Sequence, residues 1–303
     1  MSRFFALSRT THGVLDIAAP AYCALLWLGG FPRWQTTALS LFTAFAGYCA
    51  IYALNDLVGL RSDLEKFTGA RVNRGYAVDS TVHRHPVAQG ALSMKSAMVW
   101  TAAWFVLALV GSYLLRPVIV LVLLAAAALE VAYCRLLKIT HLRTVLGGLV
   151  KTSGPIAAVL VVDPNPSPFF LVLLLAWLFP WEIGGQNIPS DWNDTLEDRR
   201  VRARTIPIRF GFEASGRIIL IALALSVAAS AFLPLISPRR LGALYVLVSL
   251  LLGYVLLLRP GLQLYRLKEG GLAARLFDRA SYYPLAHLAL ICAFLLGGVP
   301  RAM

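Results

Sequence analysis

Apolar residues run along this chain in long blocks that alternate with shorter polar stretches. Each block is long enough to form a helix across about 30 Å of hydrocarbon, because an α-helix rises about 1.5 Å per residue. The predicted spans are residues 14–32, 36–55, 96–115, 117–134, 144–162, 167–187, 216–236, 240–258 and 281–299. Little more than Arg116 and Pro117 separates the third block from the fourth, so eight spans are the alternative to nine.

The composition agrees with this pattern. Of the 303 residues, 58% are hydrophobic and 14% are charged, whereas soluble domains have about 25% charged residues. We therefore expect an all-α, polytopic membrane protein, with one integral membrane domain over residues 1–303 surrounded by membrane lipids. We predict no cleavable signal peptide, because the first apolar block is followed by further spans.

The positive charges indicate an orientation. If the N-terminus is cytoplasmic, 22 of the 28 Lys and Arg residues fall on the cytoplasmic side, as the positive-inside rule requires. We expect an integral membrane protein, of the inner membrane if the source is bacterial, with its N-terminus and both long polar loops in the cytoplasm. The net charge of +13 then reflects topology and attraction to anionic lipid, so we predict no nucleic-acid partner. Lys151 lies within a span, where it either snorkels or faces a cavity.

Two long polar loops, 56–95 and 188–215, carry related motifs. Each follows a span that ends in Asn and Asp, with the sequences NDLVGLRSD (55–63) and QNIPSDWNDTLED (186–198). A basic stretch with Pro and Gly four residues apart follows each, in HRHPVAQG and in ARTIPIRFG. We infer an internal duplication with halves at about 1–143 and 144–280 and a final helix at 281–299. Repeats of this kind commonly place a site at the central cavity between the halves.

The acidic residues of the second loop fall on one helical face. Asp191, Asp194 and Asp198 are spaced i, i+3 and i+7, which aligns their side chains. Such acids could be a solvated helix end, a site for a hard cation, or part of a proton or cation path through a transporter. Oxygen ligands without His or Cys nearby suit Mg²⁺, which usually shares its coordination with substrate phosphates.

A transporter would instead place its acids deep within the spans. The candidates for that alternative are Asp16, Glu130 and Glu182. The densest acids lie at the cytoplasmic ends of the spans, and basic residues that could surround a metal-bound diphosphate follow them. These basic residues are Arg61, Lys66, Arg71, Arg74 and Arg84 in the first loop, and Arg199, Arg200, Arg202, Arg204 and Arg209 in the second.

At these motifs the sequence resembles the UbiA superfamily of intramembrane prenyltransferases, over nearly the whole chain. DWNDTLEDRRVRARTIPIRFG (191–211) fits the family's D-x-x-D-x-x-x-D, followed by a basic stretch and T-[LI]-P-[VI]-x-x-G. YCRLLK (133–138) fits the family's Tyr-x-x-x-Leu-Lys, and Arg9 stands where the family often has an arginine before its first span. The resemblance implies Mg²⁺-dependent transfer of a polyprenyl group from a prenyl diphosphate to a lipophilic or aromatic acceptor within the membrane. It implies no obligate protein partner.

The resemblance also implies roles for particular residues. Asp191, Asp194 and Asp198 would hold Mg²⁺, with Asn55, Asp56 and Asp63 facing them, and we predict Asn55 and Asp63 as further metal ligands. Arg9, Lys138 and Arg204 would bind diphosphate oxygens, and Tyr133 would donate a hydrogen bond to the same group. Asn187, one turn before Asp191, would support these ligands or contact the acceptor.

The first motif departs from the family pattern N-D-x-x-D-x-x-x-D. Gly59 stands where the family has its middle aspartate, and the stretch after Asp63 (TGARVNRGYAVDSTVH) is longer than usual. The departure is compatible with one metal instead of two, with an unusual substrate, or with an inactive member that binds a partner. It is also compatible with a member of different chemistry, such as phosphoribosyl transfer or cyclisation.

Overall fold

The computed structural model describes residues 2–67 and 85–298 of the chain. These residues contain no β-strand, and nine of their helical segments are long and apolar enough to cross a membrane. The prediction of an all-α bundle with nine spans is therefore confirmed. Arg116, in an extended conformation, ends one span and begins the next, so the third and fourth apolar blocks form two helices.

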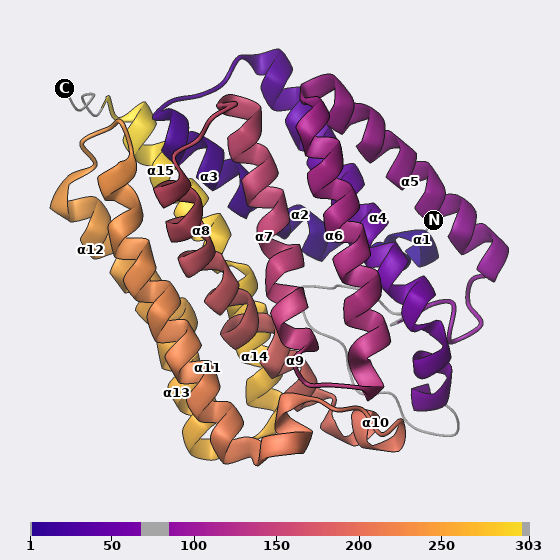
Figure 1. The fold of residues 1–303 in the computed structure, drawn as a ribbon. Helices are drawn as coiled ribbons and strands as arrows, with labels where there is room; N and C mark the ends of the chain where they lie inside the picture. Colours follow the sequence, from indigo (N-terminus) through magenta and orange to yellow (C-terminus); the bar gives the residue numbers. More distant parts are fainter. Residues whose placement is uncertain (1, 68–84, 299–303) are drawn as a thin grey trace.

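The helices run side by side between two ends of the bundle (Figure 1). In chain order the elements are α1 (Ser2–Leu7), α2 (Thr10–Asp16), α3 (Ala18–Leu28), α4 (Trp34–Phe67), α5 (Met94–Leu115), α6 (Pro117–Arg135), η2 (Leu136–Lys138), α7 (Arg143–Val162), α8 (Pro168–Trp181), η3 (Glu182–Asn187), α9 (Ile188–Asn193), α10 (Thr195–Arg200), α11 (Ile206–Phe232), η4 (Leu233–Ile236), α12 (Gly242–Gly253), η5 (Tyr254–Leu258), α13 (Arg259–Leu267), α14 (Gly270–Ser281) and α15 (Tyr283–Leu296).

Several helices extend well beyond the apolar blocks that predict them. The helix α4 continues to Phe67, past the predicted span end at residue 55. The seventh span, α11, begins at Ile206, but its backbone is not helical at Gly211, where φ is 76° and ψ is 171°, so its continuous helix starts after Gly211. Hydropathy shows where a helix leaves lipid, but a polar helix can continue into water when no proline interrupts it. The first acidic motif is therefore the last part of a long helix and not a loop.

The sixth span changes its helical form near the acidic end. Its α-helical part, α8, ends at Trp181, and a π-helical segment, η3, precedes α9. The extra residue per turn shifts the face on which the following side chains lie, and π segments are frequent at functional sites. Gly184 permits this segment to pack tightly, because a Cβ atom there would lie 2.9 Å from the carbonyl oxygen of Ile219 in α11.

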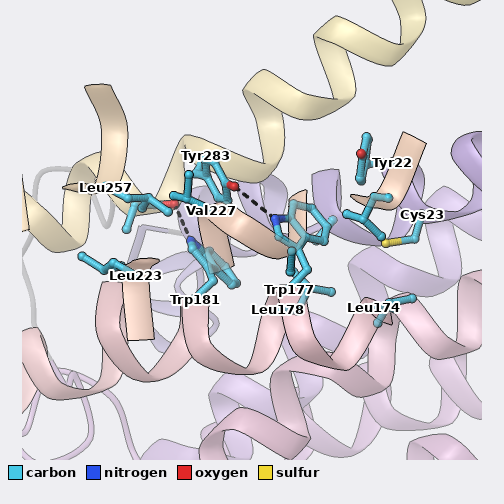
Figure 2. Packing of buried hydrophobic residues seen from close by; sticks show 14 of the residues in the cluster. Tyr22, Cys23, Leu174, Trp177, Leu178, Trp181, Leu223, Val227, Leu257 and Tyr283 are labelled. Carbon is cyan, nitrogen blue, oxygen red and sulfur yellow. Dashed lines mark hydrogen bonds between the residues drawn. The ribbon is translucent and has the colours of Figure 1, made fainter. Parts of the chain in front are cut away.

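The main hydrophobic core lies among α3, α8, α11, α14 and α15. Trp177 Nε1 donates to the hydroxyl of Tyr283 at 3.2 Å, and Trp181 Nε1 donates to the carbonyl oxygen of Ala280 at 2.9 Å (Figure 2). Each buried indole N–H is thus satisfied while its ring fills the core. The larger of the two cavities described below is lined by α4, α5, α6 and α7 and also by α3 and η3.

Candidate active site

Two cavities meet inside the bundle. One is polar, has a volume of about 140 Å³, and lies where α4, α6, α7, α9 and α10 approach each other; the other is mostly apolar and has a volume of about 490 Å³. Four residues line both cavities and so form their junction: Arg9, Asn55, Tyr133 and Ser190. A charged group in the polar cavity can therefore be continuous with an apolar chain in the larger one.

The second acidic run, residues 191–198, contributes three side chains to the polar cavity. Asp191, Asp194 and Asp198 all line it and are all buried. The helix is interrupted at Asp194, which separates α9 from α10, yet the amide of Asp198 still donates to the carbonyl oxygen of Asp194 at 2.9 Å. One helical turn thus connects these acids, and the predicted common face survives the break in the helix.

Two cations, one of them buried, contact two of these acids. Arg143, at the start of α7, donates from Nη2 to Asp191 Oδ1 at 2.5 Å, and its guanidinium lies 4.5 Å from the ring centre of Tyr133. Lys66, near the end of α4, lies with Nζ 2.7 Å from Asp198 Oδ1. Burying such charges without partners would be costly, so the pairs hold these carboxylates and cations in place at the cavity wall.

The first acidic run, residues 56–63 near the end of α4, has different contacts from the second. His85 Nδ1 lies 3.0 Å from Asp56 Oδ1 and 3.1 Å from Asp63 Oδ2, and Arg9 Nη2 lies 3.7 Å from Asp56 Oδ1. Gly59 lies against the carboxylate of Asp63, since a Cβ atom at position 59 would lie 3.3 Å from Asp63 Oδ2. A histidine, and no third acid, therefore accompanies the two aspartates of this run.

The protonation of His85 follows from these contacts. Burial by itself would lower the pKa of His85, but the carboxylates of Asp56 and Asp63 outweigh burial and raise it to about 9. His85 is therefore a cation at neutral pH. Its backbone adopts a left-handed conformation with φ of 52°, which is uncommon for a residue with a side chain.

The structure brings most of the predicted site residues together and leaves some apart. Arg9, Asn55, Asp63 and Tyr133 line the polar cavity with the three acids of the second run. Arg9 has a left-handed backbone with φ of 42° where α1 meets α2.

Two further predicted residues, Asp56 and Asn187, lie close to this group. Asp56 is buried beside His85, and Asn187 lines the apolar cavity, where its Nδ2 donates to the hydroxyl of Tyr133 at 3.1 Å. Asn55 Nδ2 donates to Glu130 Oε1 at 2.5 Å.

Lys138 and Arg204 lie outside the lining of both cavities. Lys138 Nζ pairs with Glu65 Oε2 at 2.5 Å, and Arg204 Nη1 donates to the carbonyl oxygen of Ile139 at 3.1 Å. The predicted basic residues Arg71, Arg74 and Arg84 and the whole stretch TGARVNRGYAVDSTVH lie outside the described residues.

Two cations of the site have no counterpart among the predicted residues. Arg143 is 48 residues from Asp191 in the sequence, and no local spacing connects them. His85 belongs to the basic stretch before Pro86, so the repeated pattern contained a signal for it, although its partners could not be read from that pattern. The pairing depends on how α4, α7 and α9 pack.

The polar cavity has oxygen atoms suited to a metal, but few are free of protein contacts. Within residues 2–67 and 85–298, no three His, Cys, Asp or Glu side chains form a group that could hold a metal ion alone. In the same residues, Asp191 Oδ2 and Asn187 Oδ1 are buried without a hydrogen-bond partner. Unsatisfied buried oxygens of this kind indicate an unseen ligand, and Mg²⁺ normally completes its coordination with water and substrate phosphate. The second acidic run therefore fits Mg²⁺ better than the first, because His85 already pairs with Asp56 and Asp63 there.

Comparison with known proteins agrees with this architecture. The chain is similar to a UbiA homolog from Aeropyrum pernix K1 in its apo form, with 17% identity and a TM-score of 0.72 over 94% of this chain and 98% of that one. A UbiA homolog from Archaeoglobus fulgidus bound to DMAPP and Mg²⁺ gives 14% identity and a TM-score of 0.68 over 96% and 99%.

A third similar structure comes from work on digeranylgeranylglyceryl phosphate synthase, with 16% identity and a TM-score of 0.61 over 97% of this chain and 98% of that one. At these identities the likeness shows a shared fold. A comparison with curated protein sequences finds no match. The profile of the UbiA prenyltransferase family matches residues 17–295, and this chain therefore belongs to that family.

Proposed function

We propose that this protein transfers a prenyl group from an allylic prenyl diphosphate to a lipophilic or aromatic acceptor within the membrane, with Mg²⁺ as cofactor. The observation that carries the proposal is the direct junction of a small charged cavity with a larger apolar one. A prenyl diphosphate has the same division, with a charged head and an apolar tail. The homolog from Archaeoglobus fulgidus, which shares this fold, binds DMAPP and Mg²⁺.

The second acidic run would hold the metal. Asp191, Asp194 and Asp198 line the charged cavity, and Asp191 Oδ2 has no hydrogen-bond partner within the described part of the chain. Bound there, Mg²⁺ would neutralise charge that develops on the departing diphosphate. Asn55 and Asp63, the other predicted ligands, lie across the cavity, where Asp63 already contacts His85.

Three cations at the wall of the polar cavity would bind the diphosphate itself. Lys66, Arg143 and Arg9 line the same cavity and can provide positive charge from α4, α7 and the α1–α2 turn. Charge-assisted hydrogen bonds from such fixed groups stabilise a leaving anion more than water does, because the groups need no reorganisation. Tyr133, which receives a hydrogen bond from Asn187, stands at the junction and can donate its own proton to a diphosphate oxygen.

The apolar cavity would receive the tail and the acceptor. Its aromatic lining includes Tyr48, Tyr52 and Tyr133. Aromatic faces stabilise positive charge on the allylic carbon, and an apolar wall excludes the water that would quench it.

Release of inorganic diphosphate tests this proposal. Protein in nanodiscs is given geranyl diphosphate with a panel of hydroxylated aromatic and aliphatic acceptors, and we expect Mg²⁺-dependent diphosphate release with a prenylated product in mass spectrometry. Asp198→Asn should lower kcat by about 100-fold, whereas Glu65→Gln, outside the cavities and half-exposed, should leave kcat within about twofold. Geranyl diphosphate that stays intact with every acceptor, and instead crosses liposome membranes with the protein, would support transport and refute transfer.

A further inference from the structure

The apolar cavity contains a buried polar cluster that the proposed diphosphate site does not use. Lys151 Nζ lies 2.7 Å from Asp16 Oδ2, 3.1 Å from the hydroxyl of Tyr52 and 3.3 Å from Gln186 Oε1. The hydroxyl of Tyr52 donates to Asp16, and Glu182 Oε2 lies 4.0 Å from Lys151 Nζ. Lys151 therefore faces the cavity instead of snorkelling to the membrane surface, and ionisable residues inside a membrane protein commonly mark a functional site.

The cluster lies deeper in the cavity than the junction, by about one helical turn. Tyr52 precedes the junction residue Asn55 by three positions in α4, and Lys151 follows Gly147 by four in α7. Gly147 is packed at the junction, because a Cβ atom there would lie 3.3 Å from the ring of Tyr133. A molecule bound at the cluster would therefore reach from there toward the junction, where we place the reacting prenyl carbon.

The charges of the cluster favour a neutral partner. Two carboxylates, Asp16 and Glu182, accompany one ammonium group, Lys151, and His12 Nε2 lies 3.6 Å from Asp16 Oδ1. Among the described residues, the other charged side chains that line the apolar cavity are Glu130 and Arg9, so three acids accompany two permanent cations. An acceptor that carries a carboxylate would add negative charge to a buried site where acids already exceed permanent cations. A hydroxyl group adds no charge and can donate a hydrogen bond to a carboxylate.

Glu182 has the available acceptor atom. Its Oε2 is buried without a hydrogen-bond partner within the described part of the chain, and the side chain lines the apolar cavity. Asp16 is already engaged, since Lys151 and Tyr52 both donate to its Oδ2. Leaving a buried carboxylate oxygen unsatisfied is costly, so a ligand that donates to Glu182 would be stabilised there.

We propose that this cluster binds the hydroxyl group of a neutral, lipophilic phenol, which donates a hydrogen bond to Glu182. The proposal rests on the proposed function, because it identifies the chemical class of acceptor for the same transfer. The rings of Tyr48 and Tyr52, with centroids 6.5 Å apart, line the same cavity and can pack against an aromatic acceptor.

Binding of matched probes tests the chemical class. Protein saturated with geranyl thiodiphosphate and Mg²⁺ is titrated with 4-hexylphenol, 4-hexylbenzoate, 4-hexylcyclohexanol and hexylbenzene. We expect 4-hexylphenol to bind at least about tenfold more tightly than 4-hexylbenzoate and hexylbenzene, since a charge-assisted hydrogen bond contributes about 1.5–3 kcal/mol. Tightest binding of the benzoate, or equal binding of phenol and hexylbenzene, would overturn the proposal. Tightest binding of 4-hexylcyclohexanol would overturn the assignment to a phenol.

Variants of Glu182 test the site itself. Glu182→Gln should weaken 4-hexylphenol binding by about tenfold, Glu182→Asp should retain most of the affinity, and Ser153→Ala, which changes a hydroxyl in the same cavity, should retain all of it. Binding of geranyl thiodiphosphate should be unchanged in all three. Unchanged phenol affinity in Glu182→Gln with intact thiodiphosphate binding would overturn the acceptor site alone. Loss of thiodiphosphate binding in the wild type would refute the proposed function.

Discussion

At the scale of single residues, the first acidic run shows how one missing side chain changes a site. Gly59 leaves Asp56 and Asp63 without the third acid of the family pattern, and the His85 cation contacts both aspartates. The His85 cation thus contacts the carboxylates that a second metal ion would need as ligands. We therefore expect metal to bind through the second run.

The pKa of His85 predicts a pH-dependent contribution to stability. Its folded pKa of about 9 lies above the ordinary value of 6.5, so the stabilisation is fully present below about pH 6.5 and is lost as pH rises through 9. The shift corresponds to roughly 3 kcal/mol. Thermal unfolding of detergent-solubilised wild type should shift to lower Tm between pH 6 and pH 10, and His85→Gln should lose most of that dependence while Lys95→Ala keeps it. Parallel pH profiles for wild type and His85→Gln would contradict the charge pair.

The residues of the candidate site could be predicted in part from the sequence. The spacing of Asp191, Asp194 and Asp198 predicts a common face, and the three side chains line one cavity although Asp194 separates α9 from α10. The partners Arg143 and His85 come from segments distant in the chain, and spacing contains no information about such contacts. The family resemblance predicts Lys138 as a ligand of the diphosphate, whereas in the structure Lys138 pairs with Glu65 and does not line the polar cavity.

At the scale of elements, the π-helical segment η3 positions the site. It changes the helical phase between α8 and α9, so that Glu182 and Gln186 line the apolar cavity while Asp191 and Asp194 line the polar one. The sequence contains no periodic signal for such a segment, because one inserted residue per turn resembles ordinary drift of an apolar pattern.

A substitution within this segment tests its role. The Cβ atom of Gly184→Ala would lie 2.9 Å from the carbonyl oxygen of Ile219, so η3 must move away from α11. We expect a loss of about 1–3 kcal/mol of stability, visible as a lower Tm, together with weaker binding of geranyl thiodiphosphate. Gly271→Ala in α14 is the matched control, because nothing lies within 4 Å of its Cβ atom, and it should leave Tm unchanged or slightly raised. Equal behaviour of the two variants would show that η3 tolerates displacement.

At the scale of the whole molecule, the number of spans was predictable and the cavities were not. Lipid requires a long apolar block for each crossing helix, so nine blocks in the sequence became nine spans among the described residues. The length of α4 beyond the bilayer and the junction of the two cavities depend on which helix faces pack together. The cytoplasmic orientation and the division at about 143 into two halves stay predictions.

The central claim is that the junction of the two cavities binds a prenyl diphosphate through Mg²⁺ and the second acidic run. The most direct measurement is equilibrium binding of geranyl thiodiphosphate to the purified protein, with Mg²⁺ or with EDTA. Wild type should bind only with Mg²⁺, and Asp191→Asn should bind about 100-fold more weakly, which corresponds to about 2.7 kcal/mol. Asp163→Asn, whose carboxylate accepts from Trp27 at the other end of α7, should bind as wild type does. Binding that persists in EDTA, or that is equal in Asp191→Asn and wild type, would contradict the account.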